Sequence, residues 1–159
     1  MEILFSSSNI DYVKLTEELL QDYIKMVNDL NNVGSFIGMV EKTTEEKELK
    51  WVRNKLAEKA LIFSMIERKS NKFIGNIELM DPNENEAELG IAITKDMQEK
   101  GFGSEAINTL IKYGFDTLKL KRIFLKAYVY NDRAIHVYNK CGFKEYKRDD
   151  KDIYMEIFA

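Results

Sequence analysis

The sequence is poor in the residues that bind metals and form disulfides. It holds one cysteine, Cys141, and one histidine, His136, in 159 residues. A lone cysteine has no partner for an internal disulfide, and this pair cannot supply the four ligands of a structural zinc site. We therefore expect neither a disulfide framework nor a metal centre.

The sequence also lacks an excess of one charge and long hydrophobic runs. Its 24 Lys and Arg residues against 27 Asp and Glu residues give a formal net charge of −3, whereas a nucleic-acid-binding domain usually carries a strongly basic face. The longest apolar stretch, residues 60–66, is far shorter than the roughly 18 residues of a membrane-spanning helix. No basic segment precedes an apolar stretch in the first residues, as it would in a secretory signal. We expect a cytoplasmic protein with no nucleic-acid or membrane partner.

Proline and glycine, which mark linkers and turns, number only 1 and 8 residues. With 45% hydrophobic and 32% charged residues, the chain can bury one core and keep a hydrated surface. No repeat or low-complexity tract divides it. We therefore expect a single domain over residues 1–159.

The hydrophobic pattern predicts an α/β (α+β) fold with a mixed sheet and the element order βααβββαβαββ. The second helix opens with a capping box at Thr43 and Glu46, and Gly142 is placed to end the last one. The predicted helices cover residues 15–30, 43–59, 103–118 and 133–141. A short first strand is followed by predicted strands at residues 60–66, 72–80, 87–94, 122–130, 143–147 and 152–158.

A loop with two glycines, Gln98–Ala106, lies between a predicted buried strand and a predicted helix. Gly101 and Gly103 allow a tight turn that brings backbone N–H groups toward the N-terminus of the helix, where the helix dipole favours an anion. Such a loop can cradle a pyrophosphate, but two glycines before a helix are equally typical of an ordinary helix entry. The loop residues alone leave both interpretations open.

A dinucleotide-binding fingerprint is a second interpretation of the same glycines. The spacing Gly101-x-Gly103-x-x-Ala106 satisfies its variant form, with Asp132 as the ribose ligand. Asp132, however, lies 31 residues after Gly101 rather than about 20, and too few strands follow the loop to complete a doubly wound sheet. The dinucleotide interpretation therefore fits poorly.

Three segments resemble motifs of the GNAT superfamily of acetyl-CoA-dependent N-acetyltransferases, in particular the branch of ribosomal-protein N-terminal and spermidine acetyltransferases. Gln98–Gly103 is similar to the pyrophosphate loop of the family, Gln/Arg-x-x-Gly-x-Gly/Ala. Asn131–Ile135 is similar to its Asn-x-x-Ala-Ile element, and Tyr138–Phe143 to its Tyr-x-Lys-x-Gly-Phe signature. The segments occur in the family's order, and the predicted elements fit its fold.

The resemblance implies that the fourth and fifth strands, residues 87–94 and 122–130, splay apart and admit the pantetheine arm of acetyl-CoA. The arm would hydrogen-bond to the main chain of the fourth strand, which needs no particular side chains. The N–H groups of residues 100–104 would hold the pyrophosphate, Gln98 would order the loop, and Asn131 would contact the pantetheine amides. The residues that the resemblance assigns to acetyl-CoA are Ile91, Ala92, Ile93, Gln98, Lys100, Gly101, Phe102, Gly103, Ser104, Asn131, Ala134 and Tyr138.

The resemblance further implies direct attack of a neutral amine on the thioester in a ternary complex. An alkylamine has a pKa of about 10.4, so a base should help to remove its proton at neutral pH. Glu88 matches an acidic position on the family's fourth strand and is the predicted base, with Glu78 as the second candidate; a glutamate on an exposed strand face is the structural alternative. Tyr138 matches the position that protonates the departing thiolate, and a buried core tyrosine is its alternative. No recognisable pattern places a histidine to activate Cys141, so we expect no acetyl-enzyme.

The motifs leave the acceptor amine open. A protein N-terminus, a polyamine or another small amine would suit the same catalytic core, because the family builds its acceptor site from the first two helices and the later strand loops, here residues 28–42 and 81–86. A non-catalytic acyl-CoA sensor is the alternative function, although a sensor has no chemical need for the phenol of Tyr138. The family often forms dimers, so we include a homodimer among the expected partners.

Overall fold

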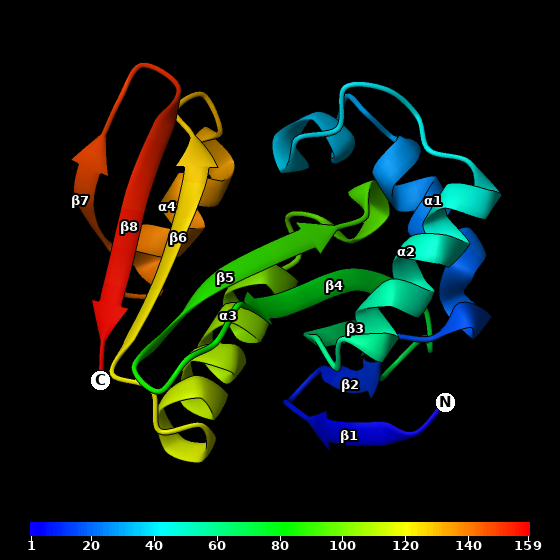
Figure 1. Cartoon of the computed structure of the whole chain (residues 1–159), viewed down its shortest axis with the longest axis horizontal. Helices are drawn as coiled ribbons and strands as arrows, with labels where there is room; N and C mark the ends of the chain where they lie inside the picture. Colours follow the sequence, from blue (N-terminus) through cyan, green and yellow to red (C-terminus); the bar gives the residue numbers. More distant parts are fainter.

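The computed structural model describes residues 1–159 as one mixed sheet with helices on both faces (Figure 1). The strand order is β1-β2-β3-β4-β5-β6-β8-β7, and all neighbours are antiparallel except β5 and β6. The strands are β1 (Ile3–Ser6), β2 (Ile10–Lys14), β3 (Leu61–Glu67), β4 (Phe73–Met80), β5 (Glu86–Ile93), β6 (Arg122–Tyr128), β7 (Lys144–Arg148) and β8 (Asp152–Phe158). The helices are α1 (Leu20–Asn28), α2 (Glu45–Ala57), α3 (Phe102–Lys112) and α4 (Asp132–Lys140).

The N-terminal segment forms a hairpin, β1 and β2, where the sequence predicts one short strand. Glu105 of α3 stabilises the turn of this hairpin through hydrogen bonds. Its carboxylate accepts hydrogen bonds from the Ser7 hydroxyl (2.6 Å) and from the backbone N–H of Asn9 (2.9 Å). The order of all later elements, from α1 to β8, agrees with the sequence prediction.

The cap of α2 differs by one residue from the predicted capping box. Thr44 caps the helix, and its hydroxyl accepts a hydrogen bond from the N–H of Lys47. Thr43 is engaged elsewhere, because its backbone N–H donates to the side-chain oxygen of Asn28 at 2.7 Å. A contact with α1 therefore decides which threonine begins the helix.

Each face of the sheet buries its own hydrophobic core. The larger core lies between the sheet and helices α3 and α4, and the smaller one lies under α1 and α2 (Figure 1). A buried polar chain links α1 to the sheet: the Tyr23 hydroxyl lies 2.6 Å from the Ser64 hydroxyl, which donates to Asn76 at 2.8 Å. These hydrogen bonds fix α1 over β3 and over β4, the strand that carries Glu78.

The two parallel strands separate soon after they begin. β5 and β6 pair from Glu86–Arg122 to Glu88–Phe124 only, and then diverge. Figure 1 shows β6, β8 and β7, with α4 behind them, standing apart from β5; we call this unit the C-terminal wing. The second half of β5, Gly90–Ile93, pairs with β4 but has no strand partner on the side of β6. The splayed strands expected from the sequence are thus confirmed.

None of the helices combines the length and the apolar character needed to cross a bilayer.

Candidate active site

The loop after β5 enters α3 at Gly101, whose φ angle is +86°. Residues other than glycine rarely adopt this left-handed conformation. The backbone and not a lack of space therefore calls for glycine here, since a Cβ would meet no atom within 4 Å. No side chain caps the N-terminus of α3. The first N–H groups of the helix therefore donate to no side chain, and such a free helix N-terminus can bind an anion such as a phosphate.

Gly103 lies where three of the predicted segments meet. A Cβ at this position would lie 3.5 Å from Ile93 Cδ1 of β5 and 3.9 Å from Val137 Cγ1 of α4. Both distances are ordinary van der Waals contacts. The fold thus brings together the end of β5, the glycine loop and the helix of the Tyr-x-Lys-x-Gly-Phe segment, which are far apart in the sequence.

Gln98, the first residue of the loop motif, contacts three separate parts of the chain. Its amide nitrogen donates to the carbonyl oxygens of Ile93 (2.9 Å) and Asn32 (3.2 Å). Its amide oxygen accepts a hydrogen bond from the Arg133 guanidinium of α4. Gln98 therefore ties the loop to the end of β5, to the connection between α1 and α2 (residues 29–44), and to the start of α4.

Asn131 begins α4 in this structure. Its side-chain oxygen accepts a hydrogen bond from the N–H of Ala134 at 3.4 Å, so Asn131 is the helix cap. Its amide nitrogen makes no hydrogen bond within the chain. Asn131 is therefore held at the open end of β6 with both N–H donors of its amide free.

Tyr138 is a buried phenol, 8% exposed, on the inner face of α4. Its ring packs edge-on against Phe143, with centroids 6.1 Å apart. Burial, with a smaller contribution from Cys141, raises the pKa of Tyr138 to about 12. Unlike the Tyr23 hydroxyl, which bonds to Ser64, the Tyr138 hydroxyl makes no hydrogen bond in the chain, and it is not among the fully buried polar atoms. The phenol stays protonated at neutral pH and keeps its proton available.

Cys141 and His136 do not form a nucleophilic pair. Burial raises the pKa of the Cys141 thiol, which favours the unreactive thiol form, and the thiol points to the Ser104 carbonyl at 3.8 Å. His136 lies on the exposed side of α4. These positions agree with a mechanism that needs no acetyl-enzyme.

Glu78 and Glu88 lie on one face of the sheet, beside the splay. Glu78 is opposite Gly90 and Glu88 is opposite Met80 in the antiparallel pair β4–β5, so the two glutamates are diagonal neighbours. Burial is the main cause of the raised pKa of each carboxyl. The charge of Lys55 lowers the pKa of Glu78 and that of Lys126 lowers the pKa of Glu88, whereas Glu88 raises the pKa of Glu78 and Asp81 raises both. Neither carboxylate makes an ion pair or a hydrogen bond in the chain. The face therefore presents two unpaired acidic groups of raised pKa.

A pocket of about 270 Å³ lies between the α1–α2 connection and the turn from β6 into α4. The two walls approach each other through Phe36 and Tyr130, whose ring centroids are 5.9 Å apart, and Tyr130 stacks on Tyr128 at 5.2 Å. The pocket is lined by Asn31, Asn32, Phe36, Tyr130, Asn131, Asp132 and Arg133.

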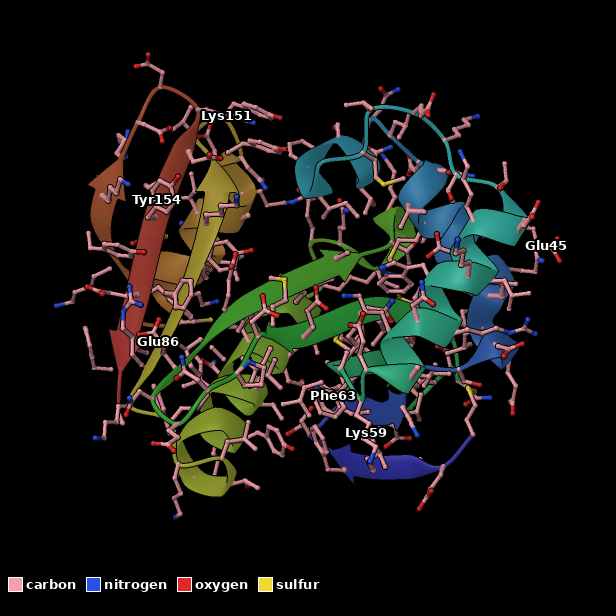
Figure 2. All side chains as sticks on the ribbon, viewed as in Figure 1. Glu45, Lys59, Phe63, Glu86, Lys151 and Tyr154 are labelled. Carbon is pink, nitrogen blue, oxygen red and sulfur yellow. The ribbon has the colours of Figure 1, made fainter.

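The aromatic rings of the C-terminal wing are already covered by cations of the chain. The wing has four cation–π contacts, whereas a chain of this length usually has about two. Lys151 lies over Tyr128 and Lys147 over Tyr154, and Figure 2 labels Lys151 and Tyr154 on the wing. Lys126 of β6, which makes no such contact, lies close enough to Glu88 to lower the pKa of its carboxyl.

Sequence reasoning missed the contacts between the walls of this site. The bond from Gln98 to Asn32 joins residues 66 positions apart, and the contact between Phe36 and Tyr130 joins loops on opposite sides of the splay. Two aromatic residues at alternate positions, Tyr128 and Tyr130, give the only pattern that could have drawn attention to this wall.

Comparison with known proteins identifies relatives of the chain. A family model described as an acetyltransferase (GNAT) domain matches residues 11–144. Spermidine N(1)-acetyltransferase of Vibrio cholerae serotype O1 is 32% identical over 127 residues, which cover 77% of this chain and 73% of that protein. The uncharacterised N-acetyltransferase p20 of Bacillus licheniformis is 29% identical over 127 residues, and the match covers 79% of this chain and 58% of that protein.

Solved structures agree with these matches. The crystal structure of spermidine N-acetyltransferase from Vibrio cholerae in complex with CoA and spermine superimposes with a TM-score of 0.86 at 25% identity, over 96% of both chains. A dodecameric structure of spermidine N-acetyltransferase from Vibrio cholerae has a TM-score of 0.75 at 25% identity, over 96% of this chain and 95% of that one.

Proposed function

This chain belongs to the GNAT family of acetyltransferases, and we propose that the amine to which it transfers the acetyl group of acetyl-CoA is a polyamine such as spermidine. The chain is an acetyl-CoA-dependent N-acetyltransferase, and its similarity to enzymes does not favour the alternative of a non-catalytic acyl-CoA sensor. Two named relatives act on spermidine, which makes a polyamine the first acceptor to test.

The observation that carries the polyamine proposal is the pair of unpaired carboxylates, Glu78 and Glu88, beside the splayed strands. A polyamine carries several ammonium groups at neutral pH and would relieve the repulsion between these carboxylates. Gly90 makes room for the Glu78 side chain, since a Cβ at this position would crowd Glu78 Oε1 at 3.2 Å. The polycation would add to the partial compensation that Lys55 gives Glu78 and Lys126 gives Glu88.

In the proposed site, the main chain of Gly90–Ile93 and the N–H groups of residues 100–104 hold acetyl-CoA, which supplies the acetyl thioester. The open edge of β5 and the uncapped N-terminus of α3 fit these two parts of the molecule. Glu88 takes the proton of the amine, directly or through water, as the new C–N bond forms. Tyr138 gives its proton to the thiolate sulfur as the C–S bond breaks.

The acceptor is tested by offering acetyl-CoA and a panel of amines to the purified chain and measuring the free thiol released. We expect kcat/KM for spermidine to exceed that for a peptide with a neutral N-terminal segment by about tenfold or more, because two carboxylates attract the polycation. The preference should weaken with added salt, since the attraction is electrostatic. A peptide acetylated faster than spermidine would contradict the polyamine proposal.

Glu88→Gln is expected to lower kcat/KM for the amine about tenfold at neutral pH, since proton removal by a positioned base accelerates such reactions. Burial raises the pKa of Glu88 above its usual value of about 4.3. A base works only when deprotonated, so kcat/KM of the wild type should fall as the pH drops through this raised pKa. Glu88→Gln should lose that acidic limb.

Two further variants complete this pH profile. Glu86→Gln is the matched control, because Glu86 lies two residues away on the same strand face and pairs with Arg122 instead; it should keep the profile. Glu78→Gln tests the second candidate. Loss of the acidic limb in Glu78→Gln, with the limb intact in Glu88→Gln, would move the base role to Glu78.

Self-association is the other part of the proposal. It is supported by the dodecameric spermidine N-acetyltransferase structure and by apolar side chains on the surface, such as Phe158, which is 62% exposed. Light scattering on the sample used for the acceptor panel gives the mass in solution.

A further inference from the structure

Gln98 is the residue that joins the cofactor loop to the acceptor side of the site. Its side chain donates to the Ile93 and Asn32 carbonyls and accepts from Arg133. The orientation of the amide follows from these partners, because two carbonyl oxygens need a donor and a guanidinium needs an acceptor. A flipped amide would set oxygen against oxygen and nitrogen against nitrogen.

The three partners surround the proposed substrates. Ile93 ends the open edge of β5, along which acetyl-CoA would lie. Asn32 and Arg133 belong to opposite walls of the 270 Å³ pocket, one in the α1–α2 connection and the other in α4. Gln98 is therefore bonded to one residue of each wall, although it belongs to the glycine loop.

Other contacts of Asn32 do not replace this link. Its side-chain amide bonds to Asp29 within the same connection, at 3.0 Å, and cannot tie the connection to the loop. Lys95 reaches the Asn32 side-chain oxygen at 3.2 Å, but Lys95 is exposed and long, so this contact is weak. Gln98 thus provides the half-buried connection between the loop and the main chain of residue 32.

We propose that Gln98 is a positioning residue that transmits binding of acetyl-CoA to the α1–α2 connection, so that the acceptor wall is ordered before the amine docks. This inference rests on the proposed function, which places acetyl-CoA on residues 98–104 and the amine near the connection. Phosphates held by the N–H groups of residues 100–104 would fix the loop. The fixed loop would in turn fix the side-chain amide of Gln98, which lies only two residues before this segment. An amine that meets an ordered wall loses less conformational entropy, which couples the two binding events.

Hydrogen exchange measures this coupling without any amine. In the wild type, CoA should slow exchange of the amides of residues 31–38 about fivefold or more, a coupling of ordinary size. In Gln98→Met, which has a similar shape and no hydrogen bonds, CoA at a concentration that saturates the variant should slow exchange by less than about twofold. Arg133→Met removes only the third contact and should keep the wild-type protection.

The controls separate this role from a general loss of structure. Gln21→Met makes the same change on the exposed side of α1 and should behave as the wild type. Gln98→Glu keeps an acceptor for Arg133 but cannot donate to Ile93 or Asn32, so it should lose the protection even if Gln98→Met does not fold.

Undiminished protection in both Gln98 variants, or no protection of residues 31–38 in a wild type that binds CoA, would overturn the inference. Failure of the same wild-type preparation to bind spermidine in a separate titration would instead overturn the acceptor proposal and leave the exchange result standing. Absence of CoA binding to the wild type would contradict both.

Discussion

Gly103→Glu is expected to lower the affinity for acetyl-CoA by about a hundredfold or more while the chain stays folded. Gly103 lies in the first turn of α3, whose N-terminal N–H groups have no side-chain cap. A carboxylate placed there would compete for these donors and repel the phosphates, and interactions with charged groups at such sites are strong. Bulk adds to the effect, because the side chain must extend into the space that the ligand would use.

The same change should not unfold the protein. A Cβ at position 103 makes only ordinary contacts with Ile93 and Val137, and an acidic residue in the first turn of a helix interacts favourably with its dipole. We therefore expect the unfolding temperature of Gly103→Glu to equal or exceed that of the wild type. Thermal unfolding and calorimetry with CoA on one preparation separate the two quantities.

Two matched variants assign the loss to charge or to bulk. Gly103→Ala should bind CoA within a few fold of the wild type, because its methyl group fits. Gly103→Gln adds nearly the same bulk as glutamate without the charge, and its affinity should lie between those of the alanine and glutamate variants. Wild-type affinity in Gly103→Glu would show that the loop does not hold the phosphates.

Local sequence rules predicted those parts of the fold that depend on neighbouring residues. Gly142 has a φ of +102° and follows α4, as its position in the sequence indicates, and Gly101 has the left-handed backbone that a tight loop needs. Alternating and helical patterns also located most elements within a few residues. Backbone conformation and hydrophobic periodicity depend on short stretches of sequence, and for that reason they can be predicted from the sequence alone.

The remaining features depend on contacts between distant residues. Thr44 caps α2 because Asn28 of α1 engages Thr43, and the N-terminal hairpin is held by Glu105, 98 positions from Ser7. The bond from Gln98 to Asn32 is of the same kind. No local pattern in the sequence indicates the partners of these residues. The resemblance therefore pointed to residues 28–42 as an acceptor region but did not predict the contacts that join this wall to the loop and to α4.

Tyr138→Phe is expected to lower kcat by about a hundredfold with little change in CoA affinity, in line with the usual contribution of a general acid. The phenol meets the requirements for this role: burial raises its pKa to about 12, so it stays protonated at neutral pH, and no hydrogen bond within the chain contributes to that pKa. Phenylalanine keeps the ring that packs on Phe143, which limits any loss of stability.

The pH profile and a second tyrosine distinguish a catalytic from a structural role. A donor with a pKa of about 12 gives no loss of activity between pH 6 and about 10 from its own ionisation, so wild type and Tyr138→Phe should differ by a constant factor over that range. Tyr113→Phe removes the hydroxyl of another ring that packs against the core, stacked on Phe5, and should leave kcat unchanged. An acyl donor with a more acidic thiol should narrow the gap between wild type and Tyr138→Phe, because a better leaving group needs less protonation. Equal turnover of Tyr138→Phe and the wild type with acetyl-CoA would leave Tyr138 as a core ring and assign the proton to solvent.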